Sequence, residues 1–62
     1  MKLTRPQERL LRALSREPFG ISVDGNWLGT GRALVARGLA EEKQPRHFTT
    51  TEAGMDRAGR IA

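Results

Sequence analysis

The sequence predicts a single small α+β domain, with two or three helices and a two- or three-stranded sheet. Three observations predict this class. A capped, leucine-patterned helix opens the chain near Thr4. A second helix stops at Gly38, and two short β-rich runs follow it on either side of Pro45. A threonine cap at Thr51 then opens a closing helix, so strands and helices alternate along one short chain.

The first helix is predicted over residues 5–16. In Thr4-Arg5-Pro6-Gln7, threonine can cap the helix, glutamine can reach back to the cap, and proline is tolerated in the first turn. Leucines gather on one side of the helical wheel, and arginines gather on the opposite side. Those arginines are Arg5, Arg9, Arg12 and Arg16. Two interpretations stay open, a solvated outer face or a surface for an acidic partner.

The segment between the two helices is rich in turn residues. Pro18 and Gly20 end the first helix, and Ile21-Ser22-Val23 alternates like a short strand that can join the later hairpin. Glycines at 25, 29 and 31 are costly in a helix, so we expect a turn near Asp24-Gly25 and a firm helix only from Thr30. Trp27 is expected to anchor the core, with an exposed interface position as the alternative.

The helix expected over Thr30–Arg37 has a buried and an outer side. Gly31, Leu34, Val35 and Gly38 form the expected buried side. The outer side carries Gly29, Ala33 and Ala36, flanked by Arg32 and Arg37. A small-residue surface edged by arginine can approach a DNA groove or a partner helix closely, or it can simply be solvated.

Glycine, proline and threonine divide the remaining chain. Gly38 ends the helix, and a strand is expected over residues 39–43. Gln44-Pro45-Arg46 has turn chemistry, and His47 to Thr50 forms the returning strand, with His47 in solvent. The last helix is predicted to begin after Thr51 and to run toward Ile61, with Met55 and Ala58 as a weak apolar stripe.

Charge and composition limit the function classes. Nine arginines and two lysines oppose seven acidic residues, which gives a net charge of +4 and suits a nucleic-acid partner. The chain has no cysteine and one histidine, so we expect no disulfide, metal site or cofactor. No nucleophile with a base and no acid–base pair can be assembled, so no catalytic residue is predicted and an enzyme is not expected. No apolar run approaches the ~20 residues of a membrane span, and a cytoplasmic location is expected.

The pattern RGLAEE…RHFTTTEAG resembles the C-terminal half of a winged helix-turn-helix domain, similar to the multiple-antibiotic-resistance regulator class and to small bacterial and phage domains. The resemblance covers residues 32–54 well and the first helix loosely. It implies a recognition helix that ends in Arg-Gly-Leu, then a two-stranded wing, then a helix opened by the Thr-Glu-Ala-Gly segment. The chain departs from this pattern in having little room for a separate second helix before Arg32.

The resulting hypothesis is a DNA-binding protein, either a transcription regulator or a recombination accessory factor, with the Arg32 helix in the major groove and the wing on the backbone or minor groove. The predicted contact residues are Asn26, Thr30, Arg32, Ala33, Arg37, Lys43 and Arg46, with the arginines of the first helix as a second basic set. A core this small supplies about 3–5 kcal/mol of net stability, so a homodimer is a further possibility. The alternative is a protein-binding adaptor on the same scaffold, which the acidic pair Glu41-Glu42 favours.

Overall fold

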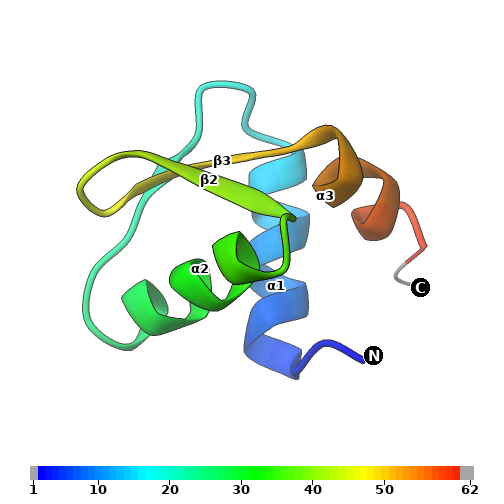
Figure 1. Ribbon diagram of the computed structural model, residues 1–62, viewed down its shortest axis with the longest axis horizontal. Coiled ribbons are helices and arrows are strands. Elements are labelled where there is room, and N and C mark those ends of the chain that lie inside the picture. The colour runs from blue at the N-terminus through cyan, green and yellow to red at the C-terminus, as the bar shows by residue number, and fades with distance from the viewer. Residues whose placement is uncertain (1, 61–62) are drawn as a thin grey trace.

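The computed structural model describes residues 2–60, which form three helices around a three-stranded antiparallel sheet (Figure 1). The elements in chain order are α1 (Arg5–Ser15), β1 (Ile21–Ser22), α2 (Asn26–Ala36), β2 (Ala40–Gln44), β3 (His47–Thr50) and α3 (Glu52–Ala58). The α+β class with three helices and three strands is therefore confirmed. Residues 16–25 contain only turns and β1, so a single helix lies between β1 and the hairpin.

The start of α1 is the predicted capping box. The Gln7 backbone N–H donates to Thr4 Oγ1 at 3.3 Å, and the Thr4 N–H donates to Gln7 Oε1 at 3.0 Å. Two donors that the helix itself leaves unpaired are thus satisfied. The leucine side of the helix faces inward, as predicted, with Leu10, Leu11 and Leu14 buried.

The sheet has the strand order β1-β3-β2, so β3 is its central strand. Ile21 pairs with Phe48, which confirms that β1 adds to the hairpin as a third strand. The strand expected over residues 39–43 instead runs from Ala40 to Gln44, because the Leu39 N–H donates to Leu34 O at 3.0 Å and closes the turn that follows α2. A bulge between Glu42 and Gln44 leaves Lys43 without a partner residue on β3.

His47 is not the solvated strand residue that the sequence predicts. Its side chain is half-buried, and both ring nitrogens have partners. Nδ1 lies 2.8 Å from Ser22 Oγ, and Nε2 lies 2.8 Å from the carbonyl oxygen of Phe19. Because Ser22 and Phe19 lie on β1 and just before it, the imidazole ties this short edge strand to β3.

The second helix begins at Asn26, four residues before the expected start at Thr30. The turn at Asp24-Gly25 is present, with Gly25 at φ 60°. At Gly31 the penalty assigned to helix glycines is outweighed by packing, since this residue is buried against the ring of Phe48. Tertiary contacts override propensity at this helix.

The core forms where the inner faces of α1, α2 and the sheet meet. Phe48 on β3 is fully buried, and so are the leucines that surround it. The buried apolar residues are Leu3, Leu10, Leu11, Leu14, Leu34, Ala40 and Phe48. These residues fill the space between the elements, so other large side chains remain outside it.

Several residues predicted to be buried are exposed. Trp27 is 41% exposed, so the prediction of a core anchor is wrong; the exposure agrees with the alternative of an exposed interface position, whose interface role stays a prediction. On α2, Gly31 and Leu34 are buried as expected, but Val35 and Gly38 face solvent. Met55 is also exposed, and the buried residue of α3 is Gly54.

Thr51 joins the end of α2 to the start of α3. Its hydroxyl donates to the Gly38 carbonyl at 2.7 Å and accepts from the Gly54 N–H at 3.0 Å. The predicted cap at Thr51 and the left-handed stop at Gly38 (φ 76°) are both confirmed. Helix α3 ends at Ala58, and Gly59 and Arg60 form a turn, so the helix is shorter than the expected run toward Ile61, a residue that lies outside the described part of the chain.

Candidate nucleic-acid interface

The outer face of α2 carries small or short polar side chains. Asn26, Gly29 and Ala36 are exposed, and Ala33 and Thr30 are half-buried. Burial of Gly31 and Leu34 on the opposite side fixes this orientation. The face therefore presents little steric bulk, and another surface can come close to the helix backbone.

Arg32 flanks this face and reaches the hairpin. Its guanidinium lies 3.4 Å (Nε to Oε1) and 3.5 Å (Nη2 to Oε2) from the Glu42 carboxylate on β2. Both distances are long for charged hydrogen bonds, and the Arg32 side chain is 59% exposed. The pair is thus weak and open to solvent, so Arg32 can exchange Glu42 for another anion.

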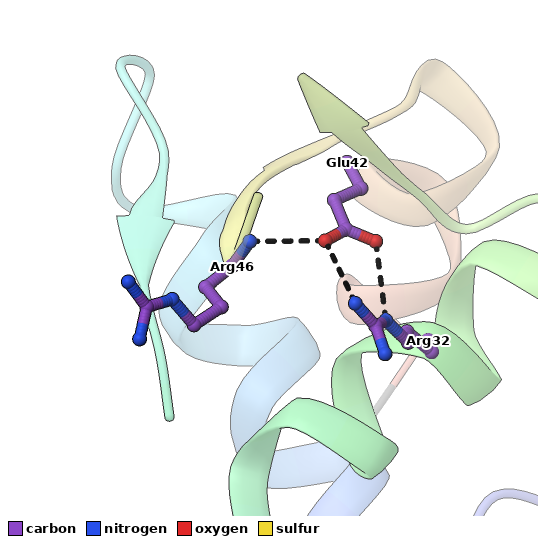
Figure 2. Close-up of polar contacts among 3 residues, drawn as sticks. All are labelled: Arg32, Glu42 and Arg46. Atoms are coloured by element: carbon purple, nitrogen blue, oxygen red, sulfur yellow. Dashed lines mark hydrogen bonds and ion pairs between the residues drawn. The ribbon is translucent and has the colours of Figure 1, made fainter. Parts of the chain in front are cut away.

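Glu42 also holds the hairpin turn. Its Oε2 accepts the Arg46 backbone N–H at 2.9 Å, so one carboxylate contacts both α2 and the turn (Figure 2). We call these three residues, Arg32, Glu42 and Arg46, the Glu42 clamp. The Arg46 guanidinium points away from Glu42 in Figure 2, which leaves the side chain exposed at the turn.

The backbone of Arg46 adopts the left-handed conformation, with φ 67°. Pro45 precedes it, and a positive φ after proline is typical of a type II turn, where glycine is the usual residue. A side chain in this conformation costs about 1–2 kcal/mol. An arginine where glycine would be less strained indicates that its side chain has a role at the turn.

The clamp lowers the pKa of Glu42 below its ordinary value. The main cause is the hydrogen bond from the Arg46 N–H, and the second is the hydrogen bond from Arg32. Both partners stabilise the carboxylate over the protonated acid. Because the folded protein holds this proton less tightly than the unfolded chain, the clamp contributes stability above the unfolded pKa of Glu42. That contribution is lost as the pH falls through the lower folded pKa.

We predict that Glu42→Gln lowers the unfolding temperature at neutral pH and leaves it nearly unchanged at strongly acidic pH. Thermal unfolding followed by circular dichroism between neutral and acidic pH checks this. Arg32→Ala should retain most of the wild-type pH dependence, because the Arg46 N–H is the larger cause. Parallel pH profiles for wild type and Glu42→Gln would contradict the role assigned to the clamp.

The other predicted cations lie in different surroundings. Lys43, on the bulge, pairs with Glu41 at 2.8 Å, and Arg37 is exposed at the end of α2. On α1, the side chains of Arg5, Arg9, Arg12 and Arg16 form no ion pair or hydrogen bond within residues 2–60. The two predicted basic sets therefore differ, since acidic neighbours partly neutralise the α2 and hairpin set.

Part of the α1 set lies beside the predicted contact residues of α2. Arg5 and Arg9 line a hollow of about 430 Å³ together with Asn26, Thr30 and Trp27. Arg12 and Arg16 instead line a hollow with Met55 on the side of α3. The structure thus brings Asn26 and Thr30 next to one half of the basic stripe and leaves the other half apart.

Sequence reasoning missed two features of this surface. It counted Glu42 only as part of an acidic pair that favours a protein-binding adaptor, whereas the carboxylate accepts a hydrogen bond from the turn. It placed Trp27 in the core, although this residue belongs to the first turn of α2 and its side chain lines a hollow together with Arg5 and Arg9. The sequence carried one weak signal for Trp27, because a tryptophan that follows a glycine turn and precedes a helix lies at an element end.

No group of metal-binding side chains occurs within residues 2–60, and no helix of that part is long and apolar enough to cross a membrane. Comparison with known proteins adds no relative: no family model matches the chain, and neither curated proteins nor solved structures gave a significant match.

Proposed function

We propose that this protein is a cytoplasmic DNA-binding protein of the winged helix-turn-helix type, acting as a small transcription regulator or a recombination accessory factor. In this proposal the outer face of α2 enters the major groove, and the turn between β2 and β3 contacts the backbone or the minor groove. The order of elements supports it, because a hairpin directly follows the helix that carries the small-residue face.

The observation that carries the proposal is the Glu42 clamp. It brings an arginine of α2 and the turn that bears Arg46 to the same carboxylate, so a helix and a hairpin lie close enough to meet one ligand together. The strained backbone of Arg46 supports the same conclusion, since glycine would relieve the strain but would remove the guanidinium. Phosphate oxygens are ligands that arginine binds in bidentate fashion.

The absence of a separate second helix changes how the domain would dock. With one helix between β1 and the hairpin, α1 takes over packing behind α2. One such module covers only about 600–1,000 Å² of DNA-facing surface, so we propose binding as a dimer or in arrays.

The experiment is fluorescence anisotropy with a labelled random-sequence duplex at about 50 and about 200 mM salt. We expect micromolar or tighter binding at the lower salt, weakened more than about tenfold at the higher salt, because phosphate neutralisation releases counterions. The double change Arg32→Ala and Arg46→Ala should lower the salt slope by about 2, one for each lost phosphate contact.

Arg60→Ala is the matched control, because Arg60 is an exposed arginine just after α3 that pairs with Asp56. This variant should bind like the wild type. Absence of binding at the lower salt would overturn the proposal, since the electrostatic part does not need a specific sequence. The remaining candidate would then be a protein-binding adaptor, which the Arg32–Glu42 and Lys43–Glu41 pairs favour because they neutralise two predicted DNA contacts.

A further inference from the structure

A groove on the α1 side of the molecule is separate from the clamp. It consists of two hollows that share Trp27 and Arg9. The first has a volume of about 430 Å³ and is lined by Arg5, Pro6, Arg9, Asn26, Trp27 and Thr30. The second has a volume of about 340 Å³ and is lined by Arg9, Leu10, Ala13, Ile21, Val23 and Trp27. We call them together the Trp27 groove.

The walls of the second hollow are apolar, whereas the first hollow also has Asn26 and Thr30 in its lining. Trp27 stands between the two hollows with 41% of its surface exposed. Around the second hollow, Arg9 is the one charged residue, and all other lining residues are apolar. Exposed large apolar side chains that gather at a concave site indicate a place where another molecule binds.

The rim of the groove is strongly basic. Arg5 and Arg9 line the groove itself, and Arg12 and Arg16 continue the stripe along α1, where Arg9 also contributes to a third hollow. Their side chains have no ion pair within residues 2–60, and no acidic residue lines either hollow. Like charges one turn apart repel each other, so an occupant with negative charge would relieve the repulsion.

The chemistry of the groove selects among the occupants that carry negative charge. A second copy of this chain would bring the same four arginines to the contact, which opposes self-association at this face. A single-stranded nucleic acid would find one aromatic ring for stacking, but its bases would find few polar partners around the second hollow. An acidic peptide with a large apolar side chain matches both the walls and the rim.

We propose that the Trp27 groove binds an acidic segment of a partner protein, with a leucine or phenylalanine side chain in the hollow beside Ile21 and Val23 and with carboxylates on Arg5 and Arg9. The groove shares Asn26 and Thr30 with the proposed DNA contacts, but neither Arg32 nor Arg46 is among its lining residues.

The test uses a short synthetic peptide that alternates Asp and Glu with Leu and Phe. Trp27 is the only tryptophan in the chain, so its fluorescence reports on the groove directly. Binding should be saturable in the micromolar range and shift the Trp27 emission to shorter wavelength as the ring leaves water. Peptides with Ser in place of Leu and Phe, or with Lys in place of the acids, should not produce the shift.

Variants of the protein locate the site. Their binding of a fluorescein-labelled peptide is measured by fluorescence anisotropy. Trp27→Ala should weaken binding more than about tenfold, as for a buried aromatic anchor, and Arg9→Ala by about fivefold, as for a rim charge. Arg46→Ala and Arg60→Ala are the controls and should bind the peptide like the wild type. Circular dichroism checks that each variant is folded.

Two results would overturn the proposal. One is the absence of saturable peptide binding by the folded wild type. The other is tighter binding of a single-stranded oligonucleotide than of the peptide, lost in Trp27→Ala, which would assign the groove to nucleic acid. Arg46→Ala should weaken duplex binding and leave peptide binding unchanged. The failure of the peptide proposal can therefore be told apart from the failure of the proposed DNA-binding function.

Discussion

Replacing Gly31 by alanine is expected to destabilise the domain by about 1–3 kcal/mol. A Cβ at this position would lie 2.6 Å from Cε2 of Phe48 and 2.8 Å from Cε1 and Cζ of the same ring. The ring is fully buried, so it cannot turn away without displacing its own neighbours. Since the net stability of such a small core is about 3–5 kcal/mol, urea unfolding should show a large part of it lost.

Gly29 is the matched control in the same helix. A Cβ there meets nothing within 4 Å, so Gly29→Ala should stabilise the protein by up to about 1 kcal/mol through helix propensity alone. Glycine-to-alanine substitution is therefore expected to lower the stability at position 31 and to raise it at position 29. In a Phe48→Leu background the cost of Gly31→Ala should shrink, because a smaller side chain faces the new methyl group. Equal effects of the two glycine substitutions on stability would show that the contact with Phe48 does not exclude a larger side chain at position 31.

Replacing Gly54 by alanine is expected to have an effect at least as large, at the upper end of about 1–3 kcal/mol or above. The new Cβ would collide with the carbonyl oxygen of Leu39 and would lie 2.5 Å from Thr50 Oγ1. A backbone carbonyl cannot rotate away as a side-chain end can. Helix α3 would have to move off the end of α2, which would strain the hydrogen bonds that Thr51 makes to Gly38 and Gly54.

Gly59 provides the control for this second substitution. Its added Cβ would lie 3.5 Å from Asp56 O and 3.7 Å from Met55 O, which is ordinary contact, so Gly59→Ala should stay within about 0.5 kcal/mol of the wild type. Urea unfolding at constant pH measures both variants. A Gly54→Ala protein with wild-type stability would mean that α3 does not need close approach to Leu39.

Local chemistry made much of the fold predictable. The capping box at Thr4, the left-handed stop at Gly38 and the cap at Thr51 are each set by neighbours within a few residues. The alternation of Ile21 and Ser22 likewise indicated a strand that could join the hairpin, and β1 pairs with β3. In such segments the sequence pattern and the tertiary structure agree.

The errors arose where distant residues decide the outcome. Nothing near Gly31 in the sequence indicates that the Phe48 ring will press against it, so the glycines appeared to delay the start of α2. Trp27 was assigned to the core by its size, but leucines of α1 and Phe48 already fill that space. The Glu42 clamp also escaped prediction, because the distance from Arg32 to Glu42 depends on how the hairpin folds back over α2.

The central claim is that α2 and the turn between β2 and β3 form one DNA-contacting unit. The most direct measurement is a titration of the ¹⁵N-labelled protein with a random-sequence duplex at low salt, followed by amide chemical shifts in two-dimensional NMR. We expect the largest changes on the outer face of α2 and at Arg46 and His47, with small changes along α3. Unchanged α2 and turn amides, with shifts confined to α1 or α3 or absent altogether, would contradict the claim.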